Sequence, residues 1–282
     1  MNAEEKQEFK KLQESSKGLI KSRQFPGLKT LLSQFYPDKN HFIYELLQNA
    51  EDAGASNVRF EVLPDRLIFA HNGTEPFSIK HIDAITNISL STKLDEDSKA
   101  GKFGIGFKSV FAFTETPHIY TDDICFKIVD MFLPEEIPQK VTNGETIFEF
   151  PFDNVKLPAK DAIEKIEAGL KNISATTLLF LTNVREITYT LINGKSGIIE
   201  AKHDPKSEKS DTISKYVFSE FIHCSSAFDD GKVDEDTDWL RFNRRIVITT
   251  EDGKTKTHWV NIAFPIKRDN SHQGYTFSTL AK

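Results

Sequence analysis

The sequence predicts an α+β fold with a smaller β-rich unit at its C-terminal end, and three patterns support this. The stretch HFIYELLQNAEDAGASNVRFEV, residues 41–62, has apolar residues at helical spacing and then alternates as a strand does. The stretch AKDAIEKIEAGLKNI, residues 159–173, has the pattern of an amphipathic helix. From about residue 183 the pattern becomes one of hairpins, REITYTLINGKSGIIEAKH and RRIVITTEDGKTKTHWVNIAFPI, with Asn-Gly and Asp-Gly turns.

The remaining elements follow from the same signals. Residues 3–17 predict a charged helix, and a short helix closed by Pro37 follows. Asn40 can cap the helix that begins at residue 41, and Gly54 can end it. The other expected elements are a hairpin over NVRFEVLPDRLIFAHNG, a short helix over IKHIDAITNIS, a helix running into a strand from SVFAF onward, a strand over ETIFEFPF and a buried strand over TTLLFL.

Composition indicates a globular protein with an aromatic-rich interior, since 38% of the residues are hydrophobic, 28% are charged and 23 are Phe. The net charge of −6 disfavours direct binding of nucleic acid. No apolar run approaches the roughly 20 residues that cross a bilayer. The two cysteines, Cys125 and Cys224, lack metal-ligand spacing and suit a reducing compartment, so we expect a cytoplasmic protein without a membrane segment.

The first candidate site lies on the helix that begins at residue 41. At about 100° per residue, Glu45, Asn49 and Asp52 fall on one edge of the buried face, where they can line a cleft. An amide oxygen is a hard ligand suited to Mg²⁺, and a carboxylate one turn away can hold and deprotonate a water. The plain alternative is that the three are polar surface residues.

The second candidate site is the glycine-rich stretch AGKFGIGFKSVF, residues 100–111. Its glycines leave backbone N–H groups exposed, and FKSVF begins a helix whose N-terminus favours anions, so phosphates fit there. It is neither a Walker A loop, because Phe107 separates the last glycine from Lys-Ser, nor a dinucleotide fingerprint, because Ser109 replaces the third glycine. The polar segment 91–101 before it is a candidate lid. A tight structural turn is the alternative.

Together these motifs resemble a known family. ELLQNAEDA is similar to the first motif of the GHKL ATPases (gyrase, Hsp90, histidine kinase, MutL), HNG stands where they carry Asp-x-Gly, and GKFGIGFKSVF resembles the lid-hinge motif of Hsp90. ISLSTK precedes the lid as it does there. The patterns HNG.PF, GIGFKSVF and LLFL.N are most similar to the sacsin-like branch of Hsp90-type ATP-binding domains. The resemblance covers about residues 40–185.

The resemblance implies roles for residues of this chain. Glu45 would activate the attacking water, Asn49 would ligate Mg²⁺, and Asp52 would support the site through hydrogen bonds or water. Thr146 in GETIFEF would lie beneath the adenine, although without the family it is an ordinary strand threonine. Backbone N–H groups of the glycine motif and the charge of two lysines would hold the phosphates; these residues are Lys93, Gly101, Lys102, Phe103, Gly104, Ile105, Gly106 and Phe107.

One residue departs from the family pattern. His71, followed by Asn72 and Gly73, stands where most members place an Asp that accepts a hydrogen bond from the adenine amino group. A neutral imidazole can accept one hydrogen bond, whereas an imidazolium cannot. Asn72 or a water could take that role instead, so adenine selectivity is less secure than phosphate binding.

By resemblance, the chain is expected to be an ATPase module of the Bergerat fold, the Hsp90 N-terminal-like two-layer α/β sandwich with a mixed sheet. It would bind ATP with Mg²⁺, hydrolyse it slowly, and close segment 91–106 as a switch for further domains of a longer chain or for a protein client, chaperone-like or defence-type. The expected domains are a helical extension over 1–39, the ATP-binding domain over 40–182 and an incomplete β-rich domain over 183–282. Dimerisation stays open.

The alternative function is a nucleotide sensor or scaffold that does not hydrolyse. The presence of Glu45, the expected general base, argues against this alternative. The presence of His71 in place of the family's Asp leaves it possible. A histidine kinase would need a phosphoacceptor helix pair upstream, and only about 40 residues precede the first motif. A DNA enzyme of the same superfamily would be expected to carry a basic surface.

Overall fold

The structure of the chain is a computed structural model, and it describes residues 1–34, 41–75, 77–87, 106–204, 209–210, 217–249 and 255–266. The chain divides into two compact units, one of Met1–Asn172 with Thr188–Lys195 and one of Ile173–Ile187 with Ser196–Lys282. The three-part division expected from the sequence, with boundaries after residues 39 and 182, stays a prediction. In the described ranges no helix is long and apolar enough to cross a membrane.

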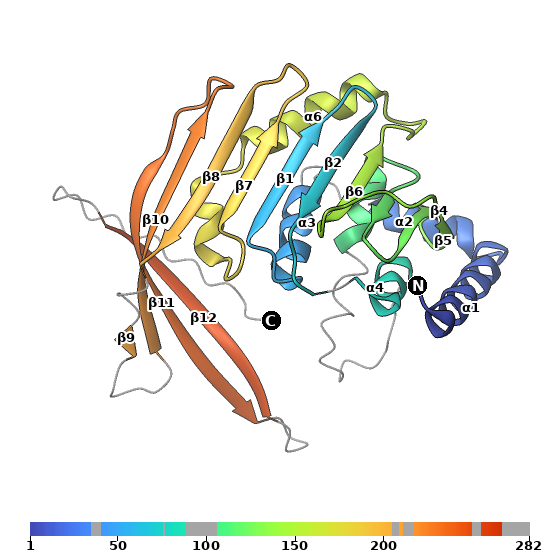
Figure 1. Cartoon of the computed structure of the whole chain (residues 1–282), viewed down its shortest axis with the longest axis horizontal. Coiled ribbons are helices and arrows are strands. Elements are labelled where there is room, and N and C mark those ends of the chain that lie inside the picture. Colours follow the sequence, from blue (N-terminus) through green and yellow to red (C-terminus); the bar gives the residue numbers. More distant parts are fainter. Residues whose placement is uncertain are drawn as a thin grey trace. The chain divides into compact units, whose positions relative to one another are not determined.

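The first unit contains both helices and strands (Figure 1). Its helices are α1 (Ala3–Ile20), α2 (Phe25–Gln34), α3 (His41–Asp52), α4 (Ile79–Thr86), the 3₁₀ helix η1 (Lys108–Ala112) and α6 (Ala159–Lys171). Its strands are β1 (Asn57–Val62), β2 (Arg66–His71), β3 (His118–Tyr120), β4 (Cys125–Val129), β5 (Leu133–Glu136), β6 (Thr146–Pro151) and most of β7 (Glu186–Thr190).

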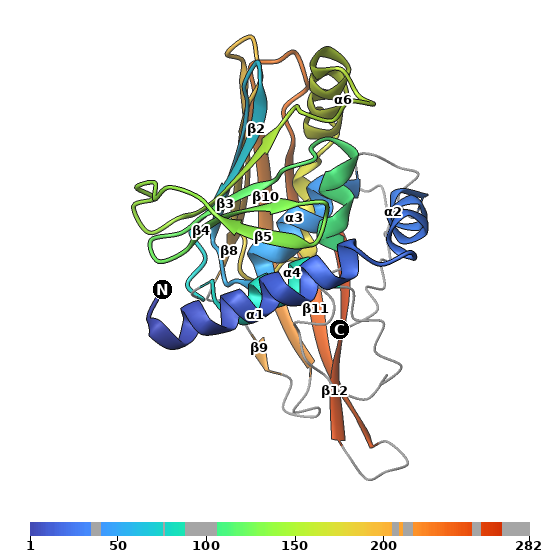
Figure 2. The same ribbon diagram turned by 90° about the vertical axis from the view of Figure 1, so that its right-hand side faces the viewer.

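The sheet of the first unit has the strand order β7-β1-β2-β6-β3-β4-β5. The β1–β2 hairpin, β2–β6, β6–β3, β3–β4 and β4–β5 are antiparallel. The arrows of β1 and β7 point the same way in Figure 1, so the sheet is mixed. Helices α3 and α6 lie on one face of it (Figures 1 and 2). The expected α+β fold with a mixed sheet covered by helices is confirmed.

Aromatic rings fill the space between helices and sheet. Phe60 and Phe69, opposite each other on β1 and β2, have ring centroids 4.8 Å apart. Phe42 on α3 packs on Phe113 at 4.7 Å, so the turn after η1 is held against this helix. These rings are at most 1% exposed, and such pairs contribute beyond their area of burial.

The N-terminal helix packs onto the edge of the sheet. Figure 2 shows α1 lying alongside β5 and α4. The Ser16 hydroxyl donates to the Phe132 carbonyl at 2.7 Å, and the Gln13 amide donates to the Pro134 carbonyl at 2.9 Å. Because these bonds tie α1 to the β4–β5 turn and to β5, this helix is part of the first unit.

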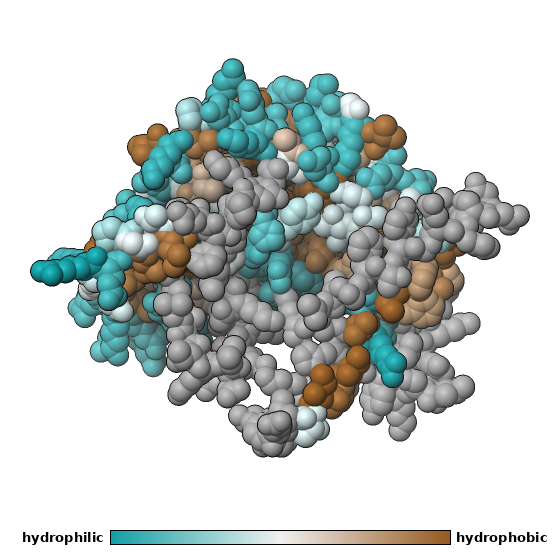
Figure 3. Space-filling model, turned by 180° about the vertical axis from the view of Figure 1, so that it is seen from behind, coloured by the Kyte–Doolittle hydropathy of each residue, from teal (hydrophilic) through white to brown (hydrophobic). Residues whose placement is uncertain are grey.

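The second unit contains the 3₁₀ helix η2 and antiparallel strands. Its elements are η2 (Ala175–Phe180), β8 (Ser196–His203), β9 (Lys209–Ser210), β10 (Val217–Phe228), β11 (Asp236–Thr249) and β12 (Thr255–Ile266), with the order β12-β11-β10-β8 and β9 paired with β10. The predicted hairpin over β11 and β12 is confirmed, and the one over β7 and β8 is closed by the hydrogen bond from Leu191 N to Lys195 O, at 2.8 Å. Large hydrophobic side chains on β11, such as Val247 and Ile248, are exposed. Figure 3 shows hydrophobic groups on one face of the molecule.

A buried ion pair lies inside this second unit. Arg241 is 4% exposed and donates through Nε to Glu220 at 2.6 Å and through Nη1 to the carbonyls of Leu179 and Leu181. Burial opposes ionisation of Glu220, but hydrogen bonds from His203 and neighbouring groups and the charge of Arg241 outweigh it and lower the pKa of Glu220 to about 2. The ion pair therefore ties η2 to β10 and β11.

For two segments the predicted type of secondary structure was wrong. The run TTLLFL is not a strand but most of η2, whose N-cap Ser174 accepts a hydrogen bond from Thr176 N. The helix expected after Phe107 is the five-residue 3₁₀ helix η1, too short to give the aligned dipoles of a long helix. The capping role of Asn40, the stop at Pro37 and the Asp-Gly turn of the second hairpin lie outside the described residues.

Candidate active site

Helix α3 presents the predicted polar edge. Five of its residues are buried apolar side chains, while Glu45, Asn49 and Asp52 are half-buried. Asn49 and Asp52 line a cavity in the first unit, and Glu45 lies one turn before Asn49. The helical geometry inferred from residue spacing therefore places the amide and one carboxylate at a cavity, as expected.

Glu45 lies against the end of the glycine-rich stretch. A Cβ placed on Gly106 would fall 1.9 Å from Oε2 of Glu45 and 2.7 Å from its Cδ. The other carboxylate oxygen, Oε1, is 2.9 Å from Nε2 of His41, one helical turn away. Only glycine at position 106 therefore leaves room for the carboxylate where it stands, and α3 and the glycine motif meet at this point.

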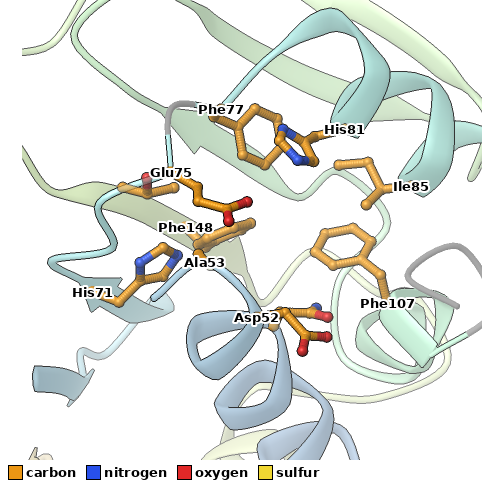
Figure 4. A pocket seen from close by; sticks show the side chains of 11 residues that line it. Asp52, Ala53, His71, Glu75, Phe77, His81, Ile85, Phe107 and Phe148 are labelled. Carbon is orange, nitrogen blue, oxygen red and sulfur yellow. The ribbon is translucent and has the colours of Figure 1, made fainter. Parts of the chain in front are cut away.

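The cavity extends from α3 to the sheet. Its volume is about 690 Å³ when the open space at its mouth is included. Figure 4 shows labelled side chains from α3, β2, α4 and the η1 region turned toward it. The lining residues are Asn49, Asp52, Ala53, His71, Glu75, Phe77, His81, Ile85, Phe107, Thr146 and Phe148.

One part of the lining is aromatic and suits a flat ring. Phe148 lies at the centre of this group, with its ring centroid 6.0 Å from that of Phe107 and 6.4 Å from that of Phe77. Phe77 in turn lies 5.4 Å from the ring of His81 on α4. Flat apolar walls with a few polar groups at defined places are typical of sites that bind nucleobases and similar rings.

The polar end of the cavity on the sheet consists of His71 and Thr146. These residues are direct partners in the β2–β6 register, and both are buried. Burial lowers the pKa of His71 to about 4, so the imidazole is neutral at pH 7. The predicted placement of Thr146 on a strand beside the site agrees with this register.

The other two residues of the HNG motif hold the backbone around His71. Gly73 N donates to Nδ1 of His71 at 3.1 Å, and a Cβ on Gly73 would meet Ala53 Cβ, Ala53 O and His71 Nδ1 at 2.9 Å each. Asn72 is exposed and does not line the cavity; its Oδ1 accepts from Ser56 N and Asn57 N at 3.0 and 2.9 Å. Asn72 therefore ties the end of β2 to the loop that follows α3.

Lys108, next to Phe107, is a buried cation. It is 2% exposed, and its Nζ donates to the carbonyls of Ile85 at 2.6 Å, of Thr86 at 3.4 Å and of Met131. It also lies 4.5 Å from the centroid of the Phe132 ring. Burial lowers the pKa of Lys108 to about 7. These bonds join η1 to the end of α4, the helix that carries His81 and Ile85 of the cavity.

The structure brings together only part of the predicted set. The predicted residues that line the cavity are Asn49, Asp52, His71, Phe107 and Thr146. Gly73 lies against His71, and Gly106 lies against Glu45 on α3. Lys93, Gly101, Lys102, Phe103, Gly104 and Ile105 lie outside the described residues. Sequence reasoning missed Glu75, Phe77, His81, Ile85 and Phe148, although the period-2 pattern of a strand places Phe148 on the same face as Thr146.

Comparison with known proteins identifies part of this chain. Residues 66–147 match the family described as "Sacsin domain". This stretch is similar to the Sacsin domain. The sacsin-like resemblance of the motifs is thereby confirmed. The Sacsin-domain stretch contains His71, Gly73, Gly106, Phe107 and Thr146, while the residues of α3 precede it.

Two curated proteins share longer stretches with the chain. Sacsin of Homo sapiens is 35% identical over 112 residues, which is 34% of this chain and 2% of that protein. Protein NO VEIN of Arabidopsis thaliana is 26% identical over 203 residues, which is 62% of this chain and 7% of that protein. The chain thus spans a small part of the length of these relatives.

Two solved structures are similar over about two thirds of the chain. The N-terminal domain of a DNA repair protein has a TM-score of 0.38 and 10% identity, covering 68% of both chains. The B-subunit of the DNA gyrase from Myxococcus xanthus has a TM-score of 0.43 and 9% identity, covering 66% of this chain and 61% of that one.

Proposed function

We propose that this chain is a nucleotide-binding module that binds ATP with Mg²⁺ and hydrolyses it slowly. The observation that carries this proposal is the cavity in which α3 supplies Asn49 and Asp52, the sheet supplies His71 and Thr146, and Gly106 of the glycine motif lies against Glu45. These segments are separated by up to about 100 residues of sequence, and they meet around one cavity. The motif resemblance supplies the expected nucleotide.

The residues present fit a magnesium triphosphate. Mg²⁺ favours oxygen ligands, keeps several waters, and is bound through one or two side chains together with phosphate oxygens. Asn49 offers an amide oxygen, and Asp52 offers a carboxylate one turn further along the same helix. Within the described residues there is no group of three or more His, Cys, Asp and Glu side chains placed to hold a metal, and such a group is not needed by this arrangement.

The chain's own residues would act by positioning and proton transfer. Mg²⁺, when bound, would neutralise charge on the phosphate oxygens. Glu45 would hold and deprotonate the attacking water, with His41 fixing one of its carboxylate oxygens at 2.9 Å. The backbone of Gly106 and Phe107 would approach the phosphates closely, and the aromatic wall around Phe148 would hold the base. The proposal includes closure of segment 91–106, which would act as a switch for further domains or for a protein client.

Binding is tested by calorimetric titration of the chain with ATP and ADP, with and without Mg²⁺. For Asn49→Ala we expect loss of the Mg²⁺-dependent part of the ATP affinity. Gln48→Ala, an exposed neighbour on α3, is the matched control and should bind as the wild type does. Unaltered Mg²⁺ dependence in Asn49→Ala would refute the assignment of Asn49 as a ligand.

Hydrolysis is tested by ADP release under single-turnover conditions. For Glu45→Ala we expect a rate lower by about 10²- to 10⁴-fold, the usual contribution of a general base, with ATP affinity retained. The rival hypothesis, a sensor that binds without hydrolysis, predicts the same background rate in the wild type and in Glu45→Ala. Such a result would leave binding in place and remove the enzymatic half of the proposal.

A further inference from the structure

The side chain of His71 is held in one hydrogen-bonding state. Its ring is 4% exposed and lies between aromatic neighbours, with centroids 5.9 Å from Phe69 and 6.0 Å from Phe148. A backbone N–H can only donate, so the bond from Gly73 N at 3.1 Å makes Nδ1 the acceptor nitrogen. In a neutral imidazole the proton is then on the other nitrogen, Nε2.

This leaves a hydrogen-bond donor facing the cavity. In the part of the chain that the structure describes, Nε2 of His71 has no hydrogen-bond partner, and the ring is part of the cavity lining (Figure 4). A ligand that fills this end would exclude water from this N–H, and an N–H buried without a partner is costly, so the ligand should bring an acceptor to it. The acceptor function of the ring is already used by Gly73.

The orientation of a nucleotide in the cavity follows from the polarity of its parts. A triphosphate is strongly hydrated and belongs near Asn49, Asp52 and the Glu45–Gly106 contact. The base then lies along the aromatic wall, and its polar edge meets the remaining buried polar groups, His71 and Thr146. A Thr hydroxyl can donate or accept, so of these two residues His71, through Nε2, is the one that discriminates.

We propose that His71 makes this site select purines that carry a hydrogen-bond acceptor at position 6, guanine or hypoxanthine, over adenine, whose 6-amino group is a donor. Carbonyl O6 of a 6-oxopurine can accept from Nε2, whereas the amino group of adenine sets donor against donor. This inference rests on the proposed function and changes only the base; Glu45, Asn49 and the glycine motif act on the triphosphate in the same way.

The test compares inosine triphosphate with ATP, because the two bases differ only at N1 and C6. Dissociation constants are measured calorimetrically with Mg²⁺, and GTP is measured alongside. We expect the wild type to bind inosine triphosphate at least about tenfold more tightly than ATP, the effect of one unsatisfied buried donor. For His71→Asp, which offers an acceptor in place of the donor, we expect the preference to reverse.

Two further variants keep the test decisive. Because an aspartate buried at position 71 can prevent folding, His71→Asn is measured as well; its amide offers both a donor and an acceptor, and the preference should fall to near one. His118→Gln changes a half-buried histidine that does not line the cavity, and it should keep the wild-type preference.

The outcomes separate this inference from the proposed function. Tighter binding of ATP than of inosine triphosphate by the wild type overturns the inference and leaves the proposed function standing. An unchanged preference in His71→Asn overturns the role of His71. If neither triphosphate binds in the presence of Mg²⁺, the proposed function itself is wrong.

Discussion

Substitution of Gly106 by alanine is the most direct test of the contact between α3 and the glycine motif. The added Cβ would stand 1.9 Å from Oε2 of Glu45, whereas non-bonded atoms settle at about 3.5 Å, so the carboxylate must move by about 1.5 Å. The Glu45 side chain is flexible and 21% exposed, and it is therefore expected to swing away rather than push the backbone aside.

The expected consequence is a loss of rate with little loss of stability. Gly106 does not have a positive φ, so alanine is compatible with its backbone. We expect the free energy of unfolding to change by less than about 1 kcal/mol, as for substitutions that leave the core intact. A catalytic group displaced by about 1 Å typically costs about 10²-fold, so the hydrolysis rate of Gly106→Ala should fall at least that far. Nucleotide affinity should stay within about threefold, because alanine keeps the backbone N–H.

The measurements are ADP release in single turnover, the dissociation constant for the triphosphate and the unfolding transition in urea. Gly27→Ala on α2 is the matched control, because a Cβ there meets nothing within 4 Å and its φ is not positive. Hydrolysis by Gly106→Ala at the wild-type rate would show that Glu45, in the position seen here, does not activate the water.

The other predictions concern buried charges. Lys108→Met should destabilise the protein by about 1–3 kcal/mol, because it leaves main-chain carbonyls without a donor. The native pKa of Lys108 is about 7 and the unfolded value is 10.5, so its contribution to stability grows as the pH rises from 7 and is lost as the pH falls through 7. Between pH 7 and pH 9 the wild type should therefore gain up to about 2 kcal/mol of unfolding free energy over Lys108→Met. A difference in stability that does not change with pH would contradict this. In the second unit, Glu220→Gln should cost about 3–5 kcal/mol in urea unfolding, because it strips the buried Arg241 of its counter-charge, and a loss below 1 kcal/mol would show that Arg241 is compensated elsewhere.

Local patterning predicted most of the fold because the strong signals agree with one another. Helix α3 has its buried residues at helical spacing, and the β1–β2 hairpin alternates, so pattern and propensity indicate the same elements. The run TTLLFL failed because a short apolar run fits a buried strand as well as a buried helical turn. The signal that separates the two was present in Ser174, the N-cap residue whose side chain accepts from Thr176 N.

The site was predictable only where its geometry is local. Glu45, Asn49 and Asp52 share one helix, so their common edge follows from residue spacing alone. The aromatic wall combines Phe77, before α4, with Phe148 on β6, and their proximity depends on strand order and helix packing. Residue types alone do not encode that order.

The HNG motif shows how a residue's chemical role can depend on its neighbours. His71 in isolation could present either a donor or an acceptor, and the sequence left that choice open. Gly73 makes the choice, because its N–H takes the lone pair of Nδ1, and the 2.9 Å contacts that a Cβ would make with Ala53 and with the ring require glycine there. Asn72 holds the same turn against the loop after α3 through two backbone amides. The three residues therefore act as one unit, and replacing an aspartate by a histidine in such a unit exchanges a fixed acceptor for a fixed donor.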